Sequence, residues 1–407
     1  MNNLEEIIPR PIYLDHILEV IDRGMMLVLV GQRRVGKSFI LMQLENELKA
    51  LNTESNIIFI NKELTQFNLI SNSDQLYGFV GERIRQSVPN YLLIDEVQDI
   101  ENFQLALRSL HAERKCQIVV TGSNAHIFSS ELATLLGGRY IEIPIYPLSY
   151  EEFLIFHRLA DSDEALFKYL KVGGLPGLSL FDIDNERQIN DYLQGVFSTI
   201  MMKDILIREN PRNANFLDNL VAFISENIGK LFSAKKITNT MISYGEKISE
   251  NLTSNYVRYL RNAMLIKAVA RYDIHGKKIF EQINKFYFTD HGLRNLLYSF
   301  SIIGSIEKLM ENVIYNHLLM WGYKVYVGET KNTEIDFVAV KGEQRLYIQS
   351  AYLLASQETI AREFGNLMTI KDHYPKMVVT LDPISGGFSE YPGIRHIRLR
   401  DFLKWQL

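Results

Sequence analysis

The chain has 407 residues, of which 47% are hydrophobic and 23% are charged, and its net charge is −4 at pH 7. This length suits roughly two to four domains, and the composition is that of a globular protein with a sizeable core. The charge excludes a general attraction to nucleic acids or anionic lipids, and a single cysteine, Cys116, excludes an internal disulfide.

Residues 1–148 have the pattern of an α/β domain. The apolar run at 25–30 ends at Gly31, as a strand buried on both faces of a parallel sheet would. Further strands are predicted at 57–60, 91–94, 118–120 and 140–145, and helices at 73–88, 101–113 and 129–136. This alternation predicts an α/β sheet with right-handed crossovers, and Pro144 and Pro147 end the pattern.

The segment after the first predicted strand matches the phosphate-binding motif GxxxxGK[ST] over residues 31–38. Its glycines let several backbone N–H groups converge on one phosphate at a helix N-terminus. Lys37 would contact the β- and γ-phosphates of ATP, and the Ser38 hydroxyl would bind Mg²⁺. The predicted nucleotide-binding residues here are Gly31, Gln32, Arg33, Arg34, Val35, Gly36, Lys37, Ser38 and Phe39.

An acidic pair follows the strand predicted at 91–94. This strand would deliver Asp95 to the carboxyl edge of the sheet, where open α/β folds bind their ligands. Asp95 is therefore the predicted partner of Mg²⁺, and Glu96 is the predicted general base that polarises the attacking water.

Two further positions are candidate catalytic residues. Thr121 and Asn124 follow the strand predicted at 118–120, where a polar side chain could touch the γ-phosphate or the water, although this turn could equally cap a helix. Arg139 could neutralise charge in the transition state, in its own chain or in a neighbour, or it could be an ordinary surface arginine that opens a strand.

The sequence resembles a group of bacterial and archaeal AAA-type ATPases that carry a C-terminal domain of unknown function and are related to the STAND-class switch ATPases. The resemblance covers nearly the whole chain and rests on Gly31-Gln-Arg-Arg-Val-Gly-Lys-Ser, Leu92-Leu-Ile-Asp-Glu-Val-Gln, Val120-Thr-Gly-Ser-Asn, Leu136-Gly-Gly-Arg, Pro147-Leu-Ser-Tyr-Glu-Glu-Phe and Gly173-Gly-Leu-Pro. It implies an ATPase core with an additional strand, followed by a helical lid at 149–208. It also implies that Pro176 lies beside the adenine, whereas the residues alone indicate a turn between helices.

Residues 209–300 are predicted to form a winged helix-turn-helix, because three helices near 216–228, 233 onward and 249–264 precede a strand hairpin. Residues 228–290 carry a local charge of +6, and Asn251, Asn255, Arg258 and Asn262 share one face of the third helix. This face beside Lys277 could contact DNA. The alternative is that the unit only packs domains together.

Residues 301–407 resemble the PD-(D/E)xK nuclease fold. Glu311 and Asp336 match its helix Glu and strand Asp, but Gln349-Ser350-Ala351 stands where Glu-x-Lys is expected. Because a neutral amide is a poor Mg²⁺ ligand and alanine cannot stabilise a phosphate, the domain is predicted to be inactive.

The leading interpretation is an ATP-hydrolysing molecular switch that uses ATP and Mg²⁺. A DNA-binding ATPase using the winged helix and an ATP-regulated nuclease are the alternatives. The sequence shows no secretory signal and no membrane-spanning run, so a cytoplasmic protein is expected. ATP and ADP are the expected small-molecule partners, with DNA, a protein client and a second copy of the chain as further candidates.

Overall fold

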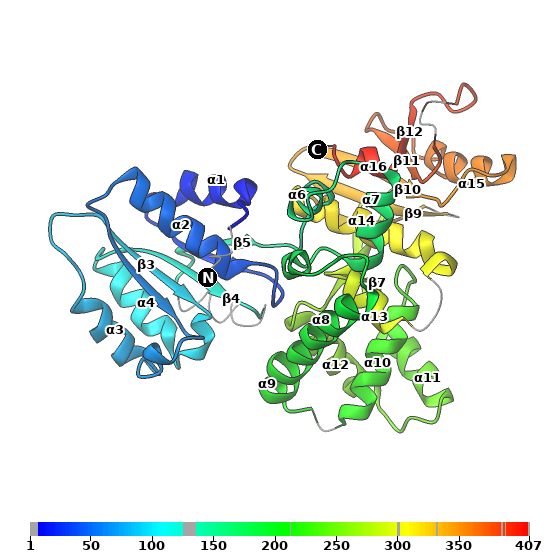
Figure 1. Ribbon diagram of the computed structural model, residues 1–407. Coiled ribbons are helices and arrows are strands. Elements are labelled where there is room, and N and C mark those ends of the chain that lie inside the picture. Colours follow the sequence, from blue (N-terminus) through cyan, green and yellow to red (C-terminus); the bar gives the residue numbers. More distant parts are fainter. Residues whose placement is uncertain are drawn as a thin grey trace. The chain divides into compact units, whose positions relative to one another are not determined.

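The computed structural model describes residues 7–124, 136–211, 213–298, 302–330, 333–383, 386 and 388–405 (Figure 1). The chain forms two compact units, Met1–Tyr146 with Asn262–Met264, and Pro147–Arg261 with Leu265–Leu407. Of the helix predicted at 129–136, residues 129–135 lie outside the described residues. The finer division into four domains stays a prediction.

The first unit is built around a five-stranded parallel sheet in the order β2-β3-β4-β1-β5. Its strands are β1 (Met26–Val30), β2 (Asn56–Asn61), β3 (Asn90–Asp95), β4 (Gln117–Gly122) and β5 (Tyr140–Pro144). All five strands were expected from their apolar runs. The sheet therefore confirms the predicted α/β class, and β4, inserted between β1 and β3, is the predicted additional strand.

Helices cover both faces of this sheet, with α1 and α2 on one face and α3 and α4 on the other (Figure 1). Their bounds are α1 (Pro11–Val20), α2 (Lys37–Leu51), α3 (Ser73–Gly81) and α4 (Phe103–Ala112), and short 3₁₀ turns lie at η1 (Thr65–Phe67) and η2 (Val97–Asp99). Every residue of β1 is buried, which explains its uninterrupted apolar sequence. The sheet is thus a rigid support for the loops at its two edges.

The second unit begins with helices. They are α6 (Tyr150–Phe156), α7 (Asp163–Val172), η4 (Pro176–Leu180), α8 (Glu186–Thr199), the π-helix η5 (Ile200–Leu206), α9 (Ile207–Glu209), α10 (Ala214–Glu226), α11 (Ala234–Ser243) and α12 (Glu250–Asn262). Helix α6 starts at a complete capping box, in which Ser149 accepts from the Glu152 backbone N–H and the Glu152 carboxylate accepts from the Ser149 N–H. No helix among the described residues is long and apolar enough to cross a lipid bilayer.

The rest of the second unit forms a mixed seven-stranded sheet in the order β12-β11-β10-β9-β8-β6-β7. The elements are β6 (Ile266–Asp273), β7 (Lys278–Phe288), α13 (His291–Leu297), η6 (Ile302–Ser305), α14 (Ile306–Met320), β8 (Lys324–Glu329), β9 (Glu334–Lys341), β10 (Gln344–Ser350), α15 (Gln357–Met368), β11 (Lys376–Thr380), β12 (Ile394–Arg398) and α16 (Leu399–Phe402). A further α/β fold therefore follows the ATPase sheet, as predicted.

The hairpin expected to be the wing belongs to this larger sheet. Strands β6 and β7 are antiparallel, with a bulge between Ala270 and Arg271, and β6 then runs parallel to β8. Sheet pairing thus crosses the boundary predicted at residue 300, a long-range pairing that local sequence patterns do not reveal. Three helices precede the hairpin as expected, while the winged helix itself stays a prediction.

The loop after α7 is held by one buried carboxylate. Asp290 accepts a hydrogen bond from the Gly174 N–H at 2.8 Å through Oδ2 and from the Leu293 N–H at 3.0 Å through Oδ1. Gly173 has φ +88°, and a Cβ there would lie 2.6 Å from Asp290 Oδ1. The Gly173-Gly174 sequence is therefore required by this close packing, whatever else the loop contacts.

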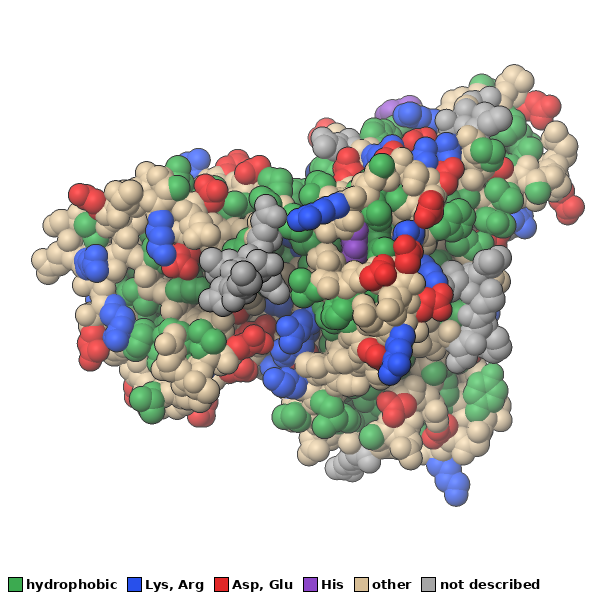
Figure 2. Space-filling view, in the orientation of Figure 1, with side chains coloured by type: hydrophobic (Ala, Val, Ile, Leu, Met, Phe, Trp, Pro, Cys, Tyr) green, Lys and Arg blue, Asp and Glu red, His purple; other side chains and the backbone are tan. Residues whose placement is uncertain are grey.

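Acidic and basic side chains lie interspersed on the visible face of the second unit (Figure 2). This unit contains a set of ion pairs. Arg398 and Arg400 both contact Asp163 at 2.8 Å, and Lys404 contacts Asp161. These pairs join the turn before α7 to the C-terminal residues, although exposed ion pairs contribute little stability individually.

Candidate functional site

The predicted phosphate-binding loop follows β1 and curls around its own lysine. Lys37 Nζ donates to the carbonyl oxygens of Gly31 at 3.0 Å and Gln32 at 3.1 Å, and only 4% of the residue is exposed. The ammonium therefore sits inside the curl, where it is placed to exchange a carbonyl partner for a phosphate oxygen.

The local structure requires glycine at both glycine positions of the motif. A Cβ on Gly31 would lie 2.4 Å from the Ile145 carbonyl oxygen, and Gly36 adopts the left-handed conformation with φ +97°. Gly36 is also the N-cap of α2 and brings no side chain to it, so the first N–H groups of the helix remain directed at a ligand. The loop thus has the anion-binding geometry that the motif predicts.

A residue outside the motif supports the loop. The Arg10 guanidinium donates to the Val35 carbonyl at 2.9 Å and lies over the Tyr13 ring, and Arg10 is 2% exposed. Its backbone N–H donates to the Gln43 side chain on α2 at 3.2 Å. No sequence motif marks this arginine, although its position just before Pro11, at the start of α1, could have suggested a fixed role.

Asp95 is the last residue of β3 and lies beside the phosphate-binding loop, at the carboxyl edge of the sheet where the sequence predicted it. Thr121 Oγ1 donates to its Oδ1 at 2.6 Å, and the Ser38 hydroxyl also hydrogen-bonds the carboxylate. Its Oδ2 is buried and accepts no hydrogen bond from the described residues. Burial raises the pKa of Asp95, against the opposing effect of these two hydroxyls. A carboxylate oxygen kept free beside Ser38 is suited to a hydrated Mg²⁺ ion.

Glu96 is held at the same edge by residues from β4. Its backbone, with φ +54°, donates to Thr121 Oγ1 at 2.9 Å, while its Oε2 accepts from Ser123 Oγ at 3.1 Å and from the Gln98 amide. Its Oε1 lies 3.9 Å from Lys37 Nζ. Burial alone would raise the pKa of Glu96, but Lys37 and Arg33 lower it below its ordinary value, so the group is an ionised base.

The end of β4 positions the acidic pair. Thr121 bridges Asp95 and Glu96, and the direct phosphate contact considered from the sequence stays a prediction. Ser123 and Gln98 were not predicted, although both follow strand ends of the same sheet edge. Asn124 is fully buried beside them, and its catalytic role stays a prediction.

Comparison with known proteins agrees with this geometry. Residues 23–154 match the AAA domain family, and residues 163–302 match a domain of unknown function. An uncharacterized Haemophilus influenzae protein is 34% identical over 406 residues, 98% of each chain. The Methanocaldococcus jannaschii protein MJ1544 is 30% identical over 346 residues, which cover 80% of this chain and 74% of MJ1544. The chain belongs to this family of AAA-type P-loop ATPases.

A solved structure shares the fold. The Walker-type ATPase PABY2304 of Pyrococcus abyssi superposes with a TM-score of 0.52 at 18% identity, over 71% of this chain and 96% of that one. At this identity the likeness shows the fold alone. It supports the arrangement of the ATPase sheet and says nothing about what the second unit binds.

Four further predicted site residues are Arg34, Phe39, Pro176 and Arg139. Arg34 and Phe39 are exposed, and Pro176 begins η4 in the second unit, so its contact with adenine stays a prediction. Arg139 precedes β5, and its carbonyl accepts from the N–H of Met26, at the start of β1. The length of a five-residue strand, ~16 Å, separates it from the loop, and its part in catalysis stays a prediction.

A second cluster of charged residues lies in the C-terminal unit. Lys285 of β7 is 2% exposed, and its Nζ lies 2.8 Å from Glu334, 3.3 Å from Glu311 and 3.4 Å from Asp336. The Tyr287 hydroxyl donates to Glu311 at 2.8 Å. The structure thus brings together the two acidic residues predicted from the nuclease resemblance and adds a lysine from the hairpin that was expected to be a wing.

The charges of this cluster depend on one another. Burial alone lowers the pKa of Lys285, but the three carboxylates raise it above its ordinary value, so the side chain is an ammonium. Burial raises the pKa of Glu311 to about 7, against the effect of Lys285. Since one ammonium cannot balance three carboxylates, a proton on Glu311 reduces the excess negative charge near neutral pH.

Gln349 is used to position Asp336. Its Oε1 accepts from the Asp336 N–H at 2.7 Å, and its Nε2 donates to Glu363 at 2.9 Å. Within the described residues no three His, Cys, Asp or Glu side chains are grouped as a metal site. Lys285 is thus the ammonium beside Glu311 and Asp336, and both the nuclease-like fold and its lack of activity stay predictions.

Proposed function

We propose that the protein is a molecular switch that binds ATP and hydrolyses it slowly at the carboxyl edge of the first sheet. The observation that carries this proposal is the convergence of Lys37, Ser38, Asp95 and Glu96, which come from β1–α2 and the end of β3. In this proposal residues 31–38 hold the phosphates, and Lys37 leaves the Gly31 and Gln32 carbonyls to contact the β- and γ-phosphates.

The same residues fit Mg²⁺, because Asp95 Oδ2 is buried without a protein partner among the described residues and Ser38 lies against the same carboxylate. When bound, the ion would neutralise charge on the β- and γ-phosphates. Glu96, ionised and oriented by Ser123 and Gln98, would accept a proton from the attacking water. The water oxygen bonds to the γ-phosphorus, the bond to the β–γ bridging oxygen breaks, and ADP and phosphate are released.

The switch role rests on how the site is linked to its surroundings. Lys37 contacts both the loop carbonyls and Glu96, and Glu96 in turn contacts β4 and the turn after β3. Loss of the γ-phosphate therefore changes partners at three chain segments at once. A second compact unit, with the helical segment predicted as a lid, is available to respond to this change.

Replacing Lys37 with alanine is expected to remove nucleotide binding, because the Lys37 ammonium lies against the loop carbonyls where the β- and γ-phosphates would bind. The measurement is titration of the protein with a fluorescent ATP analogue and Mg²⁺. Lys49, an exposed lysine at the far end of the same helix, is the matched control for an alanine change. Limited proteolysis with ATP and with ADP then tests the switch, and identical digestion patterns in the two states would remove that part of the proposal.

We propose that Arg139 acts on the nucleotide of a neighbouring copy, since its own site lies at the other edge of the sheet. Arg139→Ala should then lower the rate of hydrolysis per molecule at protein concentrations where copies assemble, and leave it unchanged at high dilution. Light scattering would show whether the wild-type protein stays monomeric over the same concentrations. A monomeric protein whose rate of ATP hydrolysis per molecule does not depend on concentration would rule out this role.

A further inference from the structure

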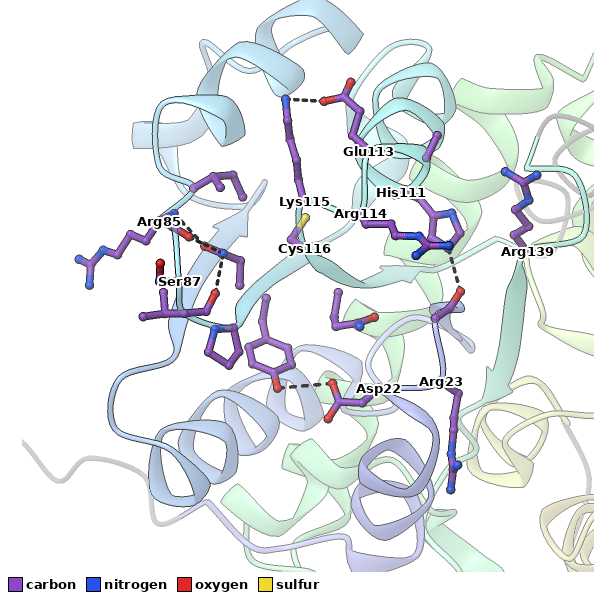
Figure 3. Close-up of a pocket in the computed structure, with 18 residues that line it drawn as sticks. Asp22, Arg23, Arg85, Ser87, His111, Glu113, Arg114, Lys115, Cys116 and Arg139 are labelled. Atoms are coloured by element: carbon purple, nitrogen blue, oxygen red, sulfur yellow. Dashed lines mark hydrogen bonds and ion pairs between the residues drawn. The ribbon is translucent and has the colours of Figure 1, made fainter.

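A large open cavity lies at the amino-terminal edge of the ATPase sheet, opposite the nucleotide site. Its volume is about 1060 Å³, and it is lined by the segments that lead into β1, β3, β4 and β5 (Figure 3). Ligands of open α/β sheets normally bind at the carboxyl edge, and in this chain that edge holds the phosphate-binding loop. The cavity is therefore separate from the ATP site.

Four of the five strands are preceded by an arginine at this edge. Arg85 lies before β3, Arg114 before β4, Arg23 before β1 and Arg139 before β5. In Figure 3 they appear in this order across the cavity, which is also the order of their strands in the sheet. At ~4.8 Å between neighbouring strands, the row spans about 14 Å.

These arginines are not neutralised by the protein. All four are exposed, and their guanidinium groups make no hydrogen bond or ion pair with any residue that the structure describes. The two carboxylates that line the cavity, Asp22 and Glu113, offset only part of this positive charge. Asp22 accepts from the Tyr91 hydroxyl at 3.5 Å, and Glu113 pairs with Lys115 and accepts from the Tyr77 hydroxyl at 2.8 Å. The edge consequently presents a net positive row to solvent.

We propose that three arginines of this row, Arg85, Arg114 and Arg23, bind the phosphodiester backbone of a nucleic acid. A guanidinium group is planar and pairs with a phosphate through two parallel N–H donors. Three arginines on neighbouring strands, ~4.8 Å apart, span about 10 Å, which is enough to reach two or three successive phosphates of one strand.

A polymer fits this edge better than a free nucleotide. The cavity volume is at the upper limit of small-molecule pockets, which run from roughly 300 to 1,000 Å³. The cations also come from three separate segments, whereas a single phosphate is usually held by clustered backbone N–H groups such as those of residues 31–38. Contacts of this kind recognise the backbone and not the base sequence.

The proposal is tested by anisotropy of a fluorescent 20-nucleotide DNA, single-stranded and as a duplex, titrated at low salt and then at rising salt. Wild-type protein should bind saturably, with a logarithmic salt slope of about −1.5 to −3 for contact with two or three phosphates. The triple variant R23E/R85E/R114E should lose about tenfold or more in affinity and most of the salt slope.

The matched control is K235E/K277E/K278E, which makes the same change in net charge at exposed lysines of the predicted winged helix. It should retain wild-type affinity. Binding that is lost in this control and kept in R23E/R85E/R114E would overturn the proposal and assign the contact to the winged helix, and no binding by the wild type at low salt would also overturn it. Uptake of the fluorescent ATP analogue by both variants shows that the first unit is folded, and keeps this result independent of whether ATP is hydrolysed.

Discussion

Replacement of Glu96 by glutamine is expected to lower kcat for ATP hydrolysis by about 10²- to 10⁴-fold, the usual contribution of a general base, while ATP still binds. Glutamine has the shape of glutamate, and its carbonyl oxygen can still accept from Ser123. It cannot take a proton from water. Because Lys37 and Arg33 lower the pKa of Glu96, the wild-type carboxylate is ionised at neutral pH, and the substitution removes a function that is fully present.

Phosphate release at saturating ATP and Mg²⁺ measures kcat, and equilibrium titration with the fluorescent analogue measures binding. Glu101→Gln, an exposed glutamate a few residues further along the chain, is the matched control and should behave as the wild type. Equal rates of hydrolysis in Glu96→Gln and wild type would remove Glu96 from its assigned role. They would leave the role of Lys37 in binding untouched.

Replacement of Lys285 by methionine is expected to destabilise the second unit by about 3–5 kcal/mol, the range found when one partner of a buried ion pair is removed. Methionine nearly preserves the volume of the side chain but leaves Glu311, Glu334 and Asp336 without their shared cation. The value should fall near the lower end, because the Glu334 side chain is 42% exposed and water can solvate it.

Denaturant unfolding followed by tryptophan fluorescence is a selective measurement here, because both tryptophans, Trp321 and Trp405, belong to the second unit. Lys278→Met, on the exposed end of the same strand, is the control and should change stability little. The double variant K285M/E311Q should recover part of the loss, since it removes one of the unpaired carboxylates. An unchanged unfolding midpoint in Lys285→Met would refute the counter-ion role.

Local motifs allowed the ATP site to be predicted in detail. The residues at 31–38 are contiguous, and Asp95 and Glu96 follow an apolar strand directly, so each half of the site is encoded over a few neighbouring positions. Parallel strands then bring the two halves to one edge of the sheet, as observed for Ser38 and Asp95. The same logic could have extended to Ser123, which ends the neighbouring strand.

The second cluster could not be predicted in this way. Lys285 and Asp336 are 51 positions apart and come from β7 and β9, which are not neighbours in the sheet. The bulge in β6 and its short parallel pairing with β8 are needed before the two can meet. The only local signal is a lysine followed by Phe286, Tyr287 and Phe288, an apolar run in which a charge is unexpected.

The carboxylate of Asp290 has a mechanical consequence for the second unit. Asp290 comes two residues after β7, the strand that contains Lys285. Its carboxylate accepts a hydrogen bond from the backbone N–H of Gly174, two residues before Pro176. Gly174 has no side chain that could move to relieve this contact, and the Asp290 carboxylate is buried. A displacement of the loop after α7 would therefore act first on Asp290, two residues beyond the strand that carries Lys285. We expect such a displacement to be felt at the charged cluster, because Lys285 is five residues from Asp290 along the chain.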